Sequence, residues 1–208
     1  NSRWEYDDLP YWDGEVDACI NAFTLANGAW LGAWPDADPP ALPGWFRDHQ
    51  LPDGGWNCEW VEGSTRSSFH STLNSLKGLL YYEQHTGDTQ ARQARITGQE
   101  YLLRRRVLYR LSTGELVGPW ATRFGYPFRW VHTALNAADY FRAAAQHVGH
   151  PLLEAVVDVV AAGRHGLGDA GPGEVGVSGA ERRLAGGIGA KKVDVTWATE
   201  ESGLILAV

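Results

Sequence analysis

One helix-forming pattern occurs twice in this chain, and the repetition restricts the folds open to it. Segments 68–76 and 130–138 each place an aromatic or apolar residue before a histidine, a small hydroxyl residue after it, and Leu and Asn in the next turn. A weaker third copy, 16–21, has Cys19 near the histidine position. Repeats of about 50–60 residues with two helices and a loop are typical of stacked helical hairpins. Chance similarity between amphipathic helices is the alternative.

Apolar residues at helical spacing extend over most of the first 162 residues, and we expect helices there. The predicted helices are 17–33, a short one at 44–49, then 67–85, 90–111, 130–146 and 152–162. No segment shows the alternation that is typical of a strand. The sequence therefore predicts an all-α fold of helical-hairpin repeats.

The composition changes near residue 162. Residues 163–208 hold 11 of the 25 glycines but only one of the 24 aromatic residues, Trp197. A glycine-rich segment loses much backbone entropy on ordering and has little apolar surface to offset that loss. We expect a repeat domain of about three hairpins at 1–162 and a glycine-rich tail at 163–208 that is loop or poorly ordered. The alternative is that the tail is not the natural continuation of the fold.

The net charge and the lengths of the apolar runs restrict the kinds of molecule that this chain is expected to bind. The net charge of -7 gives no excess of cations for nucleic acid, so we expect no nucleic-acid partner. No apolar run approaches 18 residues, so we expect no transmembrane segment and a cytoplasmic location. The basic cluster 104–106 with Arg110 could attract a diphosphate or allow peripheral contact with an anionic membrane. A solvated outer face of a helix is the alternative.

The segment 45–56 carries a more specific motif. It has an aromatic pair, then Gln50, a turn, and Gly54 and Trp56. A glutamine at this place can hydrogen-bond the N-terminal amides of the next helix while the tryptophan packs over the turn. The pattern resembles the QW motif of squalene cyclases and related triterpene cyclases. Residues 1–162 also resemble bacterial proteins described as squalene-cyclase-like or prenyltransferase-like.

This resemblance implies an α/α toroid of the terpenoid cyclase and protein prenyltransferase superfamily, with inner and outer rings of helices. Two departures limit it. The Asp-x-Asp-Asp acid motif of class II cyclases is absent, since 36–39 stops one carboxylate short, and 7–11 is no substitute for a diphosphate-binding Asp-Asp-x-x-Asp motif. Three hairpins also cannot close a ring of five or six, so we expect an incomplete ring, with N-terminal repeats missing or an open groove.

In such a toroid, the N-terminal ends of the inner helices face the cavity, which would bring the chemically active residues of the repeats together. We expect Cys19, His70 and His132 there at similar heights. Carboxylates and a second thiol lie on the preceding loops: Glu15, Asp17, Asp53, Cys58 and Glu59. Prenyltransferases of the superfamily hold zinc with Asp, Cys and His, so the resemblance offers Asp53, Cys58 and His70 as zinc ligands. The alternative is that Cys58 is a buried apolar residue and His70 a hydrogen-bonding one.

The carboxylates allow a second chemistry. Sugar enzymes built on α/α toroids use paired Asp or Glu residues, one protonated and one ionised. Candidates are Glu15, Asp17, Asp53 and Glu59, and tryptophan-rich loops could stack on sugars. Stabilisation of helix N-termini by these carboxylates is the alternative.

Aromatic residues are the third candidate group. An aromatic cavity can hold an isoprenoid chain and stabilise a carbocation. Those expected to face the cavity are Trp12, Trp56, Trp60, Phe69, Trp120, Phe124 and Trp130. We therefore expect a protein that binds or transforms an isoprenoid-type apolar molecule, with Glu15, Asp17, Asp53, His70 and His132 as catalytic candidates. A sugar-active protein and a non-catalytic repeat scaffold are the alternatives.

Overall fold

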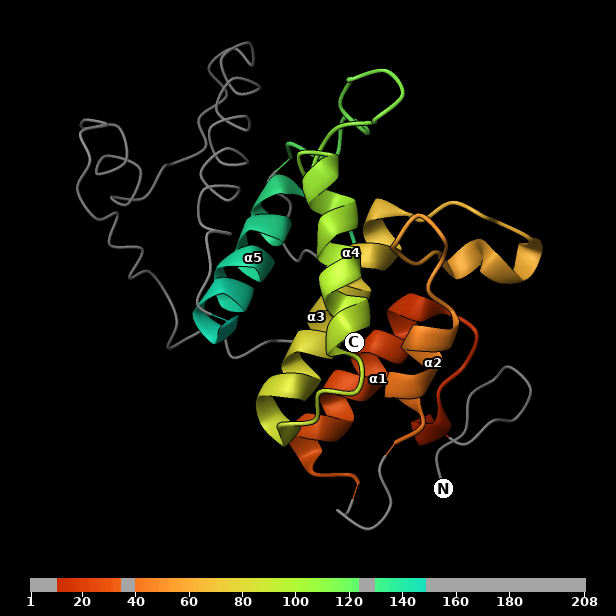
Figure 1. Ribbon diagram of the computed structural model, residues 1–208, viewed down its shortest axis with the longest axis vertical. Helices are drawn as coiled ribbons and strands as arrows, with labels where there is room; N and C mark the ends of the chain where they lie inside the picture. The colour runs from red at the N-terminus through yellow and green to blue at the C-terminus, as the bar shows by residue number, and fades with distance from the viewer. Residues whose placement is uncertain (1–10, 35–39, 124–129, 149–208) are drawn as a thin grey trace, which may run out of the picture. The chain divides into compact units, whose positions relative to one another are not determined.

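The computed structural model describes residues 11–34, 40–123 and 130–148, and these form an all-α structure (Figure 1). No β-strand occurs in these ranges, which confirms the all-α part of the predicted fold class for the described residues. The α-helices are α1 (Ala18–Leu31), α2 (Leu42–Asp48), α3 (Phe69–Thr86), α4 (Arg92–Arg104) and α5 (Ala134–Val148), and the 3-10 helices are η1 (Tyr11–Asp13) and η2 (Cys58–Glu62). The predicted helix 152–162, the tail and Phe124 lie outside the described residues.

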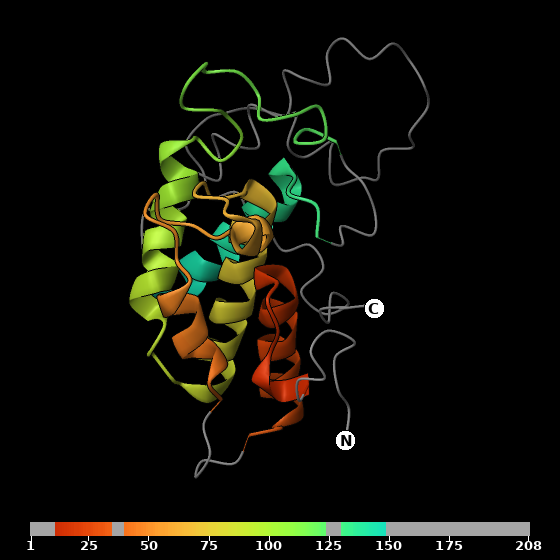
Figure 2. The same ribbon diagram turned by 90° about the vertical axis from the view of Figure 1, so that its right-hand side faces the viewer.

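Helix α3 is the centre of the arrangement, since it packs against α1, α4 and α5. Figures 1 and 2 show α1 and α3 side by side. They run in the same direction, because the start of α1 meets Asn74 and the residues after α1 meet Tyr82 near the end of α3. Midway, Gly78 allows the helices to touch: a Cβ atom there would lie 2.4 Å from the Ala22 carbonyl oxygen. This close contact holds the starts of the two helices at the same end.

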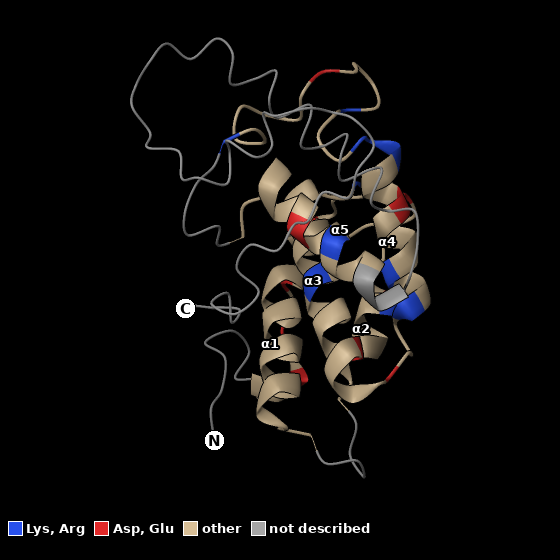
Figure 3. Cartoon of the chain, turned by 90° about the vertical axis from the view of Figure 1, so that its left-hand side faces the viewer, with Lys and Arg blue, Asp and Glu red and all other residues tan. Residues whose placement is uncertain are grey.

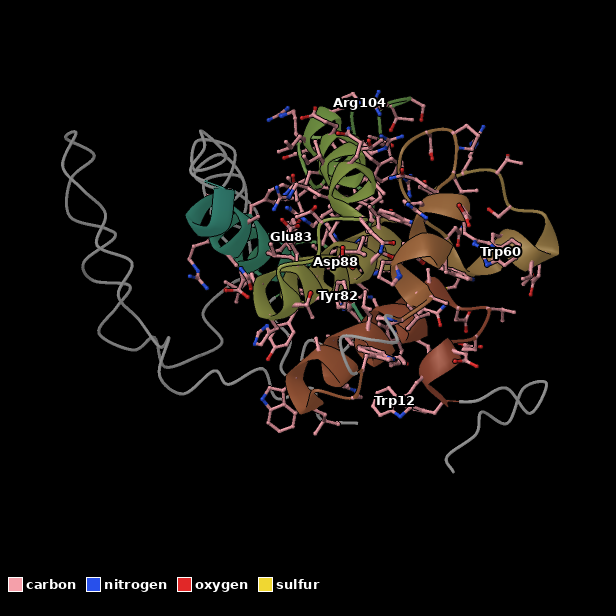
Figure 4. The ribbon with its side chains drawn as sticks, turned by 60° about the horizontal axis from the view of Figure 1, so that its bottom comes forward. Trp12, Trp60, Tyr82, Glu83, Asp88 and Arg104 are labelled. Atoms are coloured by element: carbon pink, nitrogen blue, oxygen red, sulfur yellow. The ribbon has the colours of Figure 1, made fainter. Side chains whose placement is uncertain are left out.

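The pairing of α3 with α4 is antiparallel and depends on a buried ion pair. Glu83, near the end of α3, accepts hydrogen bonds from Arg92 at 2.6 Å and from Arg95 at 3.0 Å. Arg95 is fully buried and also donates to the Tyr140 hydroxyl at 3.4 Å, which connects α4 to α5. Figure 4 shows Glu83 at this junction. Removing one partner of a buried pair leaves an uncompensated charge, so these contacts fix the pairing of the three helices.

The turn between α2 and η2 contains the residues that match the QW pattern. Trp56 is 1 % exposed and donates its indole N–H to the Phe46 carbonyl at 2.8 Å, as expected for a tryptophan that packs over the turn. Gln50 differs from the expectation. Its side-chain amide donates to the carbonyls of Gly54 and Ala94, both at 2.8 Å, instead of accepting from helix N-terminal amides. The glutamine therefore connects the turn to α4 through carbonyl groups.

Two helix boundaries differ from the predicted ones by more than two residues. The helix predicted at 90–111 ends at Arg104, because Arg106 and Val107 adopt positive φ angles of 45° and 63°. The Val107 amide donates to the Leu102 carbonyl at 2.8 Å, which closes the helix end. The helix predicted from residue 130 begins at Ala134. Within the described ranges, no helix has the length and apolarity needed to cross a membrane.

Candidate functional site

The starts of α1, α3 and α5 meet at one end of the described structure. The contacts that join them run from α1 to the loop before α3, from α3 to the loop before α5, and between two histidines. We call this group the N-end site. It comprises Cys19, Cys58, His70, Ser71, Asn74, Trp120 and His132. Sequence reasoning placed Cys19, His70 and His132 at equivalent heights, and the structure brings the three helix starts together.

The two histidines of the repeated pattern are linked directly. The His132 backbone amide donates to Nδ1 of His70 at 2.8 Å, so that nitrogen carries no proton. Nε2 of His132 lies 2.9 Å from the Val107 carbonyl oxygen and must donate to it. Nδ1 of His132 is buried and has no hydrogen-bond partner among the described residues. Each ring is therefore held as a neutral imidazole with its proton on Nε2.

Burial lowers the pKa of both imidazoles. His132 is 0 % exposed, and burial lowers its pKa to about 4. His70 is half-buried, and burial lowers its pKa as well. The indole of Trp120 covers His70, with ring centroids 4.3 Å apart, and the Phe69 ring lies 5.3 Å from the His132 ring. The two imidazoles and their aromatic neighbours are therefore uncharged near neutral pH, although the charge of Lys77 lies near enough to lower the pKa of His132 as well.

The two cysteines occupy the other side of the N-end site. The Cys19 amide, in the first turn of α1, lies 3.5 Å from Sγ of Cys58. The Ser71 hydroxyl donates to the same sulfur at 3.4 Å. Asn74 contacts Sγ of Cys19 at 3.5 Å and donates to the Trp130 carbonyl at 3.0 Å. One asparagine thus joins the starts of α1 and α3 to the loop before α5.

The proposed zinc ligands are not brought together. The Asp53 carboxylate accepts hydrogen bonds from the Ser67 hydroxyl and amide, and Arg105 lies 3.8 Å away. It thus fixes the turn before α3, while Cys58 contacts Cys19 and Ser71 instead. No group of three His, Cys, Asp or Glu side chains within 11–34, 40–123 and 130–148 is placed to hold a metal ion. Asp53, Cys58 and His70 therefore do not fit the zinc site that the family resemblance implied.

The remaining carboxylates differ in their surroundings. Glu15 is 6 % exposed, and its Oε1 has no hydrogen-bond partner among the described residues. Burial and the nearby charge of Asp17 raise the pKa of Glu15, although the backbone amides of Asp17 and Val16 donate to it. Glu59, in contrast, is exposed on η2. Glu15 is therefore the described carboxylate whose environment best suits a general acid.

The aromatic candidates lie in several places. Trp12 contacts Trp34, whose ring also contacts Tyr82 near the end of α3. Trp60 lies elsewhere, against His49, and donates to the Val16 carbonyl at 2.8 Å. Figure 4 shows Trp12 on η1 and Trp60 on η2. Trp12 is therefore not part of the N-end site, and the buried Trp56 is core.

The other three described aromatics belong to the starts of α3 and α5. Phe69 is 8 % exposed and packs on His132. Trp120 covers His70. Trp130 is 55 % exposed, although its carbonyl is held by Asn74. The ring of Trp130 is therefore open to a ligand, while its backbone is fixed by α3.

The basic cluster after α4 is engaged in contacts within the chain. Arg104 donates to the Asp53 carbonyl at 3.1 Å, and Arg105 lies over the Tyr101 ring at 3.6 Å. Arg106 lies over the Tyr109 ring, and Arg110 donates to the Val117 carbonyl. Figure 3 shows this arginine-bearing end of α4 in blue, whereas α1 has no charged residue. These arginines hold the loop after α4 in place.

Sequence reasoning missed Ser71 and Asn74 as members of the site. Both belong to the repeated pattern, as its hydroxyl residue and its asparagine, so repetition was the available signal. Comparisons with protein-family models, curated proteins and solved structures each find no match to this chain. The geometry of the N-end site is therefore the basis for a functional proposal.

Proposed function

We propose that this chain binds an isoprenoid-type apolar molecule at the N-end site, as a squalene-cyclase-like or prenyltransferase-like repeat protein. One observation carries the proposal: aromatic side chains surround two imidazoles that are uncharged near neutral pH. Trp120 covers His70, Phe69 contacts His132, and the ring of Trp130 is exposed beside them in the chain. An uncharged aromatic surface favours a hydrocarbon chain over a strongly hydrated ligand.

The helix arrangement supports the same proposal. α1, α3 and α5 have their starts at one end, and α4 packs antiparallel on α3. Parallel helices that alternate with antiparallel partners are the pattern expected for part of an α/α toroid. The ring proposed here is incomplete, so the ligand would lie in an open groove. If a reaction follows binding, Glu15 is the acid we propose, because burial and Asp17 favour its protonated form.

A second candidate function is a sugar-active protein, and it rests on the same carboxyl group. The raised pKa of Glu15, together with the neighbouring carboxyl group of Asp17, gives a carboxyl pair of the kind that glycoside hydrolysis uses. Asp53 does not strengthen this candidate, because Ser67 and Arg105 already engage its carboxylate. The apolar ligand is favoured because Trp120 contacts both histidines and Trp130 lies two residues before His132 in the chain.

Thermal unfolding with added ligand separates these functions. Farnesol, farnesyl diphosphate and a cello-oligosaccharide would each be added to the full chain. A ligand at about 100 times its Kd stabilises the folded state by about 2.7 kcal/mol, which raises Tm by several degrees. We expect farnesol to raise Tm and the oligosaccharide to have no effect. Inorganic diphosphate, added alone, shows whether farnesyl diphosphate binds through its hydrocarbon part or through its diphosphate head group.

Two exposed tryptophans provide a matched control. Trp130 is 55 % exposed beside the N-end site, and Trp30 is 70 % exposed at the other end of α1. We expect Trp130→Ala to remove more than half of the Tm shift caused by farnesol and Trp30→Ala to preserve it. No shift with either farnesyl compound would overturn the proposal, and so would an equal loss in both variants. A shift with the oligosaccharide alone would favour the sugar-active candidate.

A further inference from the structure

The N-end site contains two thiols that come from distant parts of the chain. Cys58 is the first residue of η2 and Cys19 lies in the first turn of α1, 39 residues earlier. The Cys19 amide lies 3.5 Å from Sγ of Cys58, so the two residues are in direct contact. Both cysteines are free and partly exposed. Buried cysteines that serve only as packing residues lack such polar contacts and access.

Ser71 makes the Cys58 sulfur different from that of Cys19. Its hydroxyl donates to Sγ of Cys58 at 3.4 Å, while its oxygen accepts from the Cys58 amide at 3.2 Å. The Cys58 sulfur therefore faces donors from Cys19 and from Ser71. Sγ of Cys19 accepts a hydrogen bond from the Asn74 side chain at 3.5 Å, whereas the backbone amide of Cys19 is directed to the Cys58 sulfur. Negative charge is thus better stabilised on Cys58.

The acidities of the two thiols follow this difference. The hydrogen bond from Cys19 lowers the pKa of Cys58 to about 7, with help from Ser71 and against burial and the charge of Asp17. The same hydrogen bond and burial raise the pKa of Cys19. Near neutral pH, Cys58 is therefore partly a thiolate and Cys19 a thiol. A partly exposed thiolate beside a second thiol is the arrangement found in peroxide-sensitive cysteine pairs.

We propose that Cys58 and Cys19 form a peroxide-sensitive pair in which Cys58 is oxidised first and Cys19 then closes an intramolecular disulfide. The Cys58 thiolate attacks one oxygen of a hydroperoxide, the O–O bond breaks, and Cys58 becomes a sulfenic acid while hydroxide or an alkoxide leaves and takes a proton from solvent to become water or an alcohol. The Cys19 sulfur then attacks the Cys58 sulfur, the S–O bond breaks, and hydroxide leaves with the Cys19 proton as water. Two thiols are oxidised and one peroxide is reduced.

The disulfide would covalently join α1 to the loop that precedes α3. It would also remove the thiolate from the side of the N-end site opposite the histidines. This inference does not depend on an isoprenoid ligand, because it rests on contacts of Cys19, Cys58 and Ser71 alone. Its test and the ligand test can therefore fail separately.

Hydrogen peroxide treatment of the reduced full chain, followed by mass spectrometry, tests the pair. We expect the wild-type chain to lose the mass of two hydrogen atoms and to give a cross-linked peptide pair containing Cys19 and Cys58. With dimedone present, which traps sulfenic acid, Cys19→Ser should carry an adduct on Cys58. Cys58→Ser should carry no adduct on Cys19. Circular dichroism of each variant verifies its fold.

Two serines on successive turns of α3 give a matched pair with both cysteines intact. Ser71 contacts the Cys58 sulfur, whereas the buried Ser75 hydroxyl has no partner among the described residues. We expect Ser71→Ala to slow disulfide formation roughly threefold to tenfold, because the thiolate is less stabilised, and Ser75→Ala to leave the rate unchanged. Equal rates in both variants would overturn the proposal. Oxidation of Cys19 in Cys58→Ser, disulfide-linked dimers, or separate adducts without a cross-link would do the same.

Discussion

The two copies of the repeated pattern begin their helices at different positions. In the first copy, α3 begins directly after Ser68, whose hydroxyl accepts from the Ser71 amide at 3.3 Å. In the second copy, α5 begins directly after Thr133, whose hydroxyl accepts from the Asn136 amide at 3.1 Å. Thr133 corresponds to Ser71 in the repeat, so the second helix begins one turn later. The capping hydroxyl, and not the apolar spacing, sets each start.

The later start has a consequence for the histidines. The position equivalent to Ser68 in the second copy is Trp130, which has no side-chain oxygen to cap a helix. His132 therefore precedes its helix and lies fully buried, while His70 lies inside the first turn of α3 and is half-buried. The same residue type thus has two roles. His132 is part of the core, and His70 is the one a ligand can reach.

Removing each histidine tests this difference most strongly. We expect His132→Ala to lower the free energy of unfolding by about 3–4 kcal/mol, since it leaves a cavity and an unpaired Val107 carbonyl. His70→Ala should cost about 1–2 kcal/mol, because the His132 amide loses its acceptor but the site is partly open to water. Urea unfolding of both variants measures the difference. Equal costs would show that the two copies have the same environment.

Acid should weaken the fold through the same buried histidine. His132 has a pKa of about 4 in the folded state and about 6.5 when unfolded, so the unfolded chain binds more protons between these values. Stability is therefore present above pH 6.5 and is lost as the pH falls. We expect a loss of about 2 kcal/mol from pH 6.5 to 5, measured by urea unfolding. The pKa of His70 is also lowered, so its protonation adds to the loss of stability in acid.

Glu15 acts in the opposite direction, because its pKa is raised and the folded state binds its proton more readily. The measurement is therefore best made in Glu15→Gln, with the double variant Glu15→Gln, His132→Ala as the control. A pH dependence that is unchanged by the loss of His132 would contradict the buried, neutral state of this residue.

Replacing the capping residues should give the smallest effects on stability. These variants test whether α5 begins one turn later in its copy of the repeat than α3 does. We expect Ser68→Ala and Thr133→Ala each to cost about 1 kcal/mol, the usual loss for a helix cap. Trp130→Ala, at the position equivalent to Ser68, should change stability by less than about 0.5 kcal/mol, since its ring is exposed. Thermal unfolding checks all three. A cost for Trp130→Ala as large as that for Ser68→Ala would mean that α5 does not begin at the later hydroxyl.

The apolar spacing predicted the ends of α1 and α3 to within two residues. Glycines with positive φ, Gly32 and Gly87, end these two helices. The end of α4 was not predictable in this way. A valine at positive φ is rare, and only tertiary contacts of Val107, which is 1 % exposed, hold it there. The 3-10 helix η2 has no apolar period that would predict a helix, so the sequence analysis placed its residues in a loop.

For the site, the repeat predicted which helix starts would meet, but not which loop residues would join them. Cys58 reaches Cys19 and Ser71, whereas Asp53, five residues earlier, is directed to Ser67 and Arg105. A turn between these positions separates their side chains, and its geometry depends on Gln50 and Trp56. Residue type alone therefore grouped Asp53 with Cys58 incorrectly.

Histidine NMR titration in the presence and absence of farnesol tests most directly whether the N-end site is an apolar binding site with one accessible histidine. We expect His132 to titrate near pH 4, or to remain neutral until the fold is lost, and His70 to titrate below the 6.5 of a free imidazole. Farnesol should lower the pKa of His70 further, because a bound hydrocarbon excludes water from its ring, and leave His132 unchanged. Titration of both rings near 6.5, or a His70 pKa that farnesol does not change, would contradict the proposed site.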